Sequence, residues 1–162
     1  MTQPRTNARL PAIVTAGDGK ASRAVYGDAK VYLDVAGRTL VARTVGVLMR
    51  VPEVTEVWVV GNADRLERTL REDAELRASL VKPVFVVPQY GTLYENAWLT
   101  FRRLLPGAPP EGRDPVGDEL DQPVLYLSAD LPFATPQEVS AFVQRALAAD
   151  CDYGLGLVTE ES

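Results

Sequence analysis

A chain of 162 residues, 46% hydrophobic and 24% charged, is long enough for one globular domain, and its net charge of −5 argues against nonspecific binding to nucleic acid. It has no histidine and one cysteine, Cys151, which excludes Ser-His and Cys-His nucleophile pairs, histidine zinc sites and an internal disulfide. Carboxylates, lysines, arginines and a hard metal ion such as Mg²⁺ remain as means of catalysis. No secretory signal or membrane helix is recognisable, so we expect a cytoplasmic protein without a membrane partner.

Short apolar runs alternate with helical patterns along the chain. The runs predict five strands, at residues 11–16, 55–61, 82–87, 123–128 and 153–158. Apolar residues at helical spacing predict helices at residues 39–50, 63–80, 92–105 and from 135 onward. This alternation predicts an α/β fold, a Rossmann-like three-layer sandwich with a mostly parallel central sheet, in a single domain that spans residues 1–162.

Two of the predicted helices have recognisable first turns. Thr92 and Glu95 stand at the spacing of a capping box, and so do Thr135 and Glu138, with Pro136 in the first turn of the second helix. We therefore expect both helices to begin at these positions.

Two segments do not fit the alternation of strands and helices. Residues 106–122 are rich in proline, glycine and acid, and we expect an exposed loop insertion there. Residues 24–38 are too long and too mixed for a simple strand-to-helix turn. They follow the first strand, at the edge where open α/β sheets bind ligands, so we expect this segment to be functional.

The first predicted strand runs into a glycine-rich turn followed by cations, in the stretch AIVTAGDGKASR. Backbone N–H groups at such turns can bind phosphate, and Lys20 and Arg23 add positive charge. The turn is not a P-loop, because Val14 stands where that motif has its first glycine, and no Ser or Thr follows Lys20.

The same turn partly matches the dinucleotide-binding fingerprint. Gly17 and Gly19 match two of its glycines, and Ser22 stands at the place of the third. The second strand of that unit follows soon after its helix, whereas here the second strand ends only at Gly61. A dinucleotide-binding Rossmann domain is therefore the less favoured alternative.

Four blocks of the sequence together resemble the nucleotidylyltransferase family of the GT-A-like α/β fold, which includes molybdenum-cofactor guanylyltransferases and sugar-1-phosphate nucleotidylyltransferases. The blocks are TAGDGKASR, DAKVYLDVAGRTL, EVWVVG and LYLSADLPFATPQEVSAFV. Their order and spacing match the family over nearly the whole chain. The resemblance implies a magnesium-dependent enzyme that transfers a nucleoside monophosphate from a nucleoside triphosphate to a phosphorylated small molecule and releases pyrophosphate.

The resemblance also implies roles for particular residues. Arg23 and Lys30 would bind the triphosphate as catalytic cations, and Asp130 would hold Mg²⁺. The remaining candidates would contact the base, sugar and phosphates of the nucleotide; these are Ala16, Gly17, Gly19, Lys20, Gln89, Gly91, Thr92 and Asn96.

The chain ends where relatives of this family continue. In them a further segment supplies acceptor-binding residues and a second metal-binding carboxylate. We therefore expect the N-terminal portion of a longer nucleotidylyltransferase domain, inactive by itself. The alternative is a noncatalytic nucleotide-binding or interaction domain of the same fold. The base, the acceptor and the oligomeric state are left open.

Overall fold

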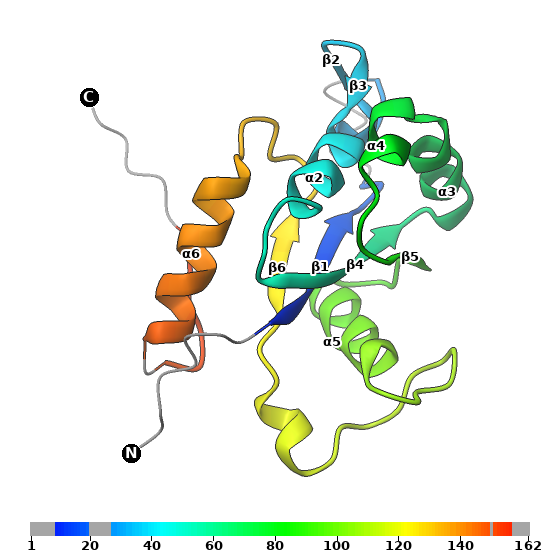
Figure 1. Ribbon diagram of the computed structural model, residues 1–162. Coiled ribbons are helices and arrows are strands. Elements are labelled where there is room, and N and C mark those ends of the chain that lie inside the picture. The colour runs from blue at the N-terminus through cyan, green and yellow to red at the C-terminus, as the bar shows by residue number, and fades with distance from the viewer. Residues whose placement is uncertain (1–8, 20–26, 150, 157–162) are drawn as a thin grey trace.

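The computed structural model describes residues 9–19, 27–149 and 151–156. Its centre is a sheet of four parallel strands in the order β5-β4-β1-β6, drawn in Figure 1. The strands are β1 (Leu10–Ala16), β4 (Val54–Gly61), β5 (Val84–Pro88) and β6 (Leu125–Ser128). At the carboxyl edge the register pairs Ala16 with Gly61 and Thr15 with Ser128.

Helices cover both faces of this sheet, and alternation along the strands explains why. Val14 of β1 belongs to the larger core, which also contains residues of α2 (Leu40–Leu48), α3 (Ala63–Glu72), α4 (Ala74–Ser79) and α6 (Pro136–Ala148). Ile13 points to the other face and packs in a smaller core with Leu104 of α5 (Leu93–Leu104). Figure 1 shows α2 between α6 and the α3–α4 pair, with α5 apart from them. The predicted three-layer α/β fold is confirmed.

The segment between β1 and α2 contains a one-turn helix and a hairpin. These are η1 (Lys30–Tyr32), β2 (Asp34–Val35) and β3 (Arg38–Thr39). Ala36 and Gly37 form the hairpin turn, and both have positive φ, at 51° and 82°. The Asp34 carboxylate accepts a hydrogen bond from the Gly37 amide at 2.8 Å. The Arg43 guanidinium donates to the Val35 carbonyl and thereby ties this hairpin to α2.

The predicted helix at residues 63–80 is divided into α3 and α4 at Asp73, so this prediction was wrong in its continuity. Asp73 has extended backbone and caps α4, with its side chain accepting from the Leu76 amide at 2.7 Å. The same carboxylate accepts from Arg38 Nε at 2.9 Å, and only 8% of the Asp73 side chain is exposed. Burial alone would raise the pKa of Asp73, but the bonds from Arg38 and Leu76 outweigh it and hold the pKa below 3.8.

We expect Asp73→Asn to lower the free energy of unfolding at pH 7 by about 1–3 kcal/mol, because asparagine can still cap α4 but loses the charged bond to Arg38. Because the pKa of Asp73 is lower in the folded chain than in the unfolded chain, the ionised carboxylate stabilises the fold at pH values above its ordinary pKa. This stabilisation is lost as the pH falls through the folded-state pKa. The difference between wild type and variant, measured by urea unfolding, should therefore shrink below about pH 4. A constant difference from pH 7 to pH 3 would contradict the charge argument, and Glu75→Gln, at an exposed partner of Arg38, should cost under about 1 kcal/mol.

Both helices begin at the predicted positions, and of the two predicted capping boxes the reciprocal one at Thr135 is formed. Thr92 caps α5, and its hydroxyl oxygen accepts from the Glu95 amide at 3.1 Å. Thr135 caps α6 in a reciprocal box with Glu138.

The remaining segments lie near the amino edge and the C-terminal end. Residues 106–122 include η2 (Gly117–Asp121), where Arg113 pairs with Glu119 at 2.6 Å and holds the pKa of that carboxyl at about 2. A strand was predicted at residues 153–158. Its described residues, 153–156, are exposed and form no strand, since glycines alternate with the apolar side chains there. Within the described parts of the chain, no helix combines the length and apolar character that crossing a membrane requires.

Candidate functional site

The sheet order reverses between β1 and β6. From β1 the chain crosses to β4 and then β5 on one side, whereas β6 lies on the other side of β1. The segments that leave the carboxyl ends of β1 and β6 therefore diverge, and in open α/β sheets ligands bind in the crevice this leaves. The candidate site lies at this point, above the β1 and β6 arrows of Figure 1.

Lys30 and Asp130 meet at this switch point. Lys30 begins η1 after the β1 turn, and Asp130 lies two residues beyond the end of β6. Lys30 Nζ is 3.5 Å from Asp130 Oδ2, and both side chains are partly exposed, at 46% and 31%. We expected Arg23, Lys30 and Asp130 to converge at the carboxyl ends of the first and fourth predicted strands. The structure brings Lys30 and Asp130 together, and Arg23 lies outside the described residues. Because both groups are open to solvent, the ammonium can bind an external phosphate and the carboxylate an external cation in place of their mutual ion pair.

The segment carrying Asp130 is fixed on two sides by hydrogen bonds to Ala129. The Ala129 amide donates to the Thr15 carbonyl of β1 at 2.9 Å. The Thr44 hydroxyl, 2% exposed, donates to the Ala129 carbonyl at 3.0 Å from α2. Ser128 Oγ donates to Asp130 Oδ1 at 2.5 Å. The backbone before Asp130 is therefore held by β1 and α2, and its carboxylate is oriented by Ser128 and Lys30.

An ion pair fixes the segment that carries Lys30. Arg65 of α3 donates two hydrogen bonds to the Asp28 carboxylate, at 2.8 and 2.5 Å, and these bonds raise the pKa of Arg65. The Arg65 guanidinium also lies over the Tyr32 ring, 3.7 Å from its centroid. Asp28 and Tyr32 flank Lys30 in sequence, so α3 determines where η1 and its lysine lie.

The glycine turn after β1 contacts the segment after β5. The Asp18 amide donates to Gln89 Oε1 at 3.2 Å. A Cβ built on Gly17 would lie 3.9 Å from the same oxygen, and one on Gly19 would meet no atom of the described residues within 4 Å. Ala16 is fully buried at the end of β1. The predicted nucleotide-binding residues of the two segments are thus neighbours, and the surface beside Gly19 is open to an incoming group.

The other candidates after β5 have local contacts. Asn96 Oδ1 accepts from the Tyr90 amide at 2.6 Å, and Thr92 caps α5. A Cβ on Gly91 would lie 3.1 Å from Glu95 Oε2, which is a tight approach. These bonds shape the β5–α5 turn, and the roles of Gly91, Thr92 and Asn96 toward a nucleotide stay predictions.

Two candidate cations, Lys20 and Arg23, lie outside the described residues. Among those that are described, no cluster of three or more acidic, histidine or cysteine side chains could hold a metal ion. Asp130 alone suits a Mg²⁺ site of the kind that uses one or two carboxylates together with substrate phosphates and water. Its partly exposed carboxylate fits such a site.

Sequence reasoning missed three residues that position the site. Asp28, Arg65 and Thr44 act through other residues, over sequence separations of 37 and 85 positions. No local motif marks them. The buried threonine within an apolar helix was the one available signal, because a buried hydroxyl needs a hydrogen-bond partner.

Part of the chain matches a protein-family model. Residues 10–84 match the model of IspD, 2-C-methyl-D-erythritol 4-phosphate cytidylyltransferase. No curated protein sequence matches the chain.

Solved structures with the same fold were also found. The 4-diphosphocytidyl-2C-methyl-D-erythritol synthase of Anaerococcus prevotii has a TM-score of 0.58 at 17% identity, over 91% of this chain and 54% of its own. A CMP:2-keto-3-deoxy-manno-octonic acid synthetase complexed with CTP has a TM-score of 0.59 at 14% identity, over 85% and 47%. Rv0371c of Mycobacterium tuberculosis has a TM-score of 0.52 at 17% identity, over 88% and 63%. The chain thus spans about half the length of the first two, and the resemblance seen in its motifs is confirmed.

Proposed function

We propose that this chain, which has the GT-A-like nucleotidylyltransferase fold, binds a nucleoside triphosphate with Mg²⁺ and is the nucleotide-binding portion of a nucleotidylyltransferase. The contact that carries this proposal is that between Lys30 and Asp130, 3.5 Å apart at the switch point of the sheet. In this contact Lys30 would supply the cation that binds phosphate and Asp130 the carboxylate that binds the metal, at the edge of the sheet where the Gly17–Gly19 turn follows β1. CTP is the first nucleotide to test, because the matched family model is that of a cytidylyltransferase.

The chain's own residues supply charge placement and orientation. Lys30 would leave Asp130 for the triphosphate oxygens, and Arg23 and Lys20 would add charge from the same loop. The open backbone at Gly19 would let the phosphates approach its amide, while Gln89 orients the turn through the Asp18 amide. A phosphate monoester acceptor is largely dianionic at neutral pH, so its attack on the α-phosphorus needs no general base. The lack of histidine is therefore compatible with this reaction.

Mg²⁺ would be held by Asp130 together with oxygens of the triphosphate. When bound, it neutralises charge on the phosphates and on the departing pyrophosphate. Ser128 would keep one carboxylate oxygen of Asp130 oriented.

The proposal is tested by thermal unfolding of the chain with CTP, GTP, ATP, UTP and NAD⁺, each with and without Mg²⁺. A nucleotide at about 100 times its dissociation constant should stabilise the fold by about 2.7 kcal/mol, which for a domain of this size raises Tm by roughly 5–10 °C. The rise should need Mg²⁺. Stabilisation by NAD⁺ and by none of the triphosphates would instead support the dinucleotide-binding alternative.

Transfer to a phosphorylated acceptor is the second part of the proposal. Pyrophosphate release from CTP in the presence of small phosphate esters measures it. Binding of triphosphate without release in any protein containing this chain would favour the noncatalytic nucleotide-binding domain.

A further inference from the structure

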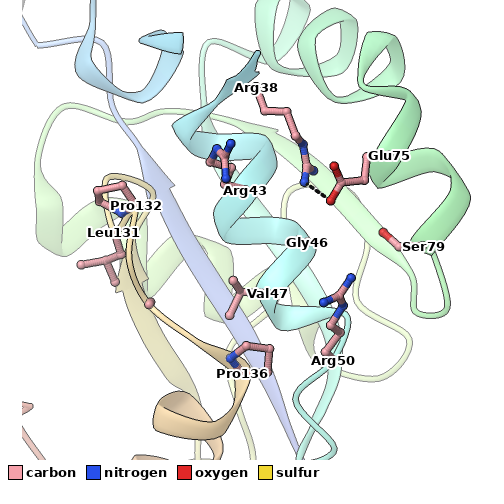
Figure 2. A pocket seen from close by; sticks show the side chains of 11 residues that line it. Arg38, Arg43, Gly46, Val47, Arg50, Glu75, Ser79, Leu131, Pro132 and Pro136 are labelled. Atoms are coloured by element: carbon pink, nitrogen blue, oxygen red, sulfur yellow. Dashed lines mark hydrogen bonds and ion pairs between the residues drawn. The ribbon is translucent and has the colours of Figure 1, made fainter. Parts of the chain in front are cut away.

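A second basic site lies on the outer face of α2. It is a cavity of about 150 Å³ bounded by α2, α4 and the segment after Asp130. Figure 2 shows Gly46 on the α2 surface among three arginines, with Leu131 and Pro132 on one side and Glu75 and Ser79 on the other. Neither Lys30 nor Asp130 lines it.

The sequence around α2 concentrates positive charge. Residues 35–52 contain three arginines and no acidic residue, in a chain whose net charge is −5. Arg43 and Gly46 are three residues apart in α2 and therefore face the same side of the helix, and Arg50, two residues beyond its end, lines the same cavity. The arginine-lined face of α2 is therefore the floor of the cavity.

The three guanidinium groups differ in how far their charge is balanced. Arg38 is paired with Asp73 and Glu75, at 2.9 and 2.6 Å. Arg43 bonds only to the carbonyls of the hairpin turn, which leaves its charge uncompensated and its Nη1 group without a hydrogen bond to the described residues. In the part of the chain that the structure describes, the Arg50 side chain has no ion pair or hydrogen bond. Two uncompensated arginines thus line one small cavity.

Gly46 provides the space for a ligand. Glycine within a helix costs up to about 1 kcal/mol relative to alanine. A Cβ here would lie 3.5 Å from Arg38 Nη2, an ordinary contact, so packing does not require glycine. The missing side chain instead leaves the cavity floor open between Arg43 and Arg50.

We propose that this cavity binds a small phosphate-bearing anion, at a site separate from the triphosphate site and independent of the proposed function. Guanidinium forks match the oxygens of phosphate, which favours an oxyanion over chloride. The volume equals that of about five water molecules, which suits a phosphate group and is below the roughly 300 Å³ of pockets for larger ligands. Because one wall begins at Leu131, the bound anion would link α2 to the segment that carries Asp130.

The test is titration of the ¹⁵N-labelled chain with sodium phosphate at constant ionic strength, with sodium chloride as the reference. The amide signal of Gly46 and the Nε–H signal of Arg50 report on the site. We expect saturable shifts with phosphate and none with chloride. Arg50→Glu should weaken binding at least tenfold, because it removes a charge-assisted bond. The matched control Arg145→Glu, at an exposed arginine of α6, should leave it unchanged.

A Lys30→Ala variant separates this site from the triphosphate site. Phosphate affinity at Gly46 should persist in it, whether or not the chain binds nucleotide. Three results would each overturn the proposal. They are an equal loss of phosphate affinity in Arg50→Glu and Arg145→Glu, shifts that do not saturate, and loss of the Gly46 response in Lys30→Ala. Glycerol 3-phosphate in place of inorganic phosphate shows which source of the group fits more tightly.

Discussion

Asp130→Asn is expected to abolish the enhancement of nucleotide binding by Mg²⁺. Asparagine keeps the shape and the hydrogen bond to Ser128 but loses the charge that a hard cation needs. The same change removes the ion pair between Asp130 and Lys30 and one negative charge beside the triphosphate, so binding without Mg²⁺ should be equal or tighter. Where a protein containing this chain turns over, its rate should fall at least about 100-fold, as when one strong electrostatic stabiliser is removed.

Calorimetric titration with CTP, with and without Mg²⁺, measures this effect. Asp118→Asn, in η2 toward the amino edge of the sheet, removes one negative charge away from the site and should behave as wild type. If Mg²⁺ enhances binding equally in wild type and Asp130→Asn, then Asp130 does not bind the metal. A purely structural aspartate would lower the unfolding free energy by about 1 kcal/mol without changing affinity.

Gly61→Ala should be the most damaging small substitution in the sheet. Its Cβ would lie 2.5 Å from the Ala16 carbonyl oxygen and 2.8 Å from Leu66 Cδ1. The Leu66 side chain can rotate away, but the Ala16 carbonyl is backbone at the end of β1 and can move only with the glycine turn that follows. We expect a loss of about 1–3 kcal/mol in unfolding free energy and weaker nucleotide binding.

Urea unfolding and CTP titration of the same protein check both effects. Gly46→Ala is the matched control, because its Cβ meets only an ordinary contact and alanine favours the helix by up to about 1 kcal/mol. Gly46→Ala should therefore be neutral or stabilising while Gly61→Ala is destabilising. Equal stability of the two variants would show that β1 and β4 can separate at their carboxyl ends without cost.

Features set by neighbours in sequence could be predicted. The starts of α5 and α6 follow from capping residues three positions apart, and the strands follow from apolar runs. The meeting of Lys30 and Asp130 was also predictable, because carboxyl ends of parallel strands share one edge.

Features set by distant partners were not predictable. The break at Asp73 depends on Arg38, 35 residues away, and apolar spacing alone continues through it. The strand predicted at residues 153–158 rested on its apolar side chains, but the glycines between them weaken a strand, and a strand also needs a neighbour to pair with, which sequence periodicity does not reveal. The arginine-lined cavity requires the segment after Asp130 to lie against α2, which no motif indicates.

The position of β1 in the sheet has a consequence for the order of folding. Its pairs with β4 join residues some 45 positions apart, whereas its pairs with β6 join residues more than 110 positions apart. Closing the longer loop costs more chain entropy, and such distant pairings form slowly. The β1–β4–β5 part can therefore assemble on a ribosome before β6 has emerged. Lys30 would then already be in the folded part of the chain before Asp130 reaches it, and nucleotide could bind productively only after β6 has paired with β1.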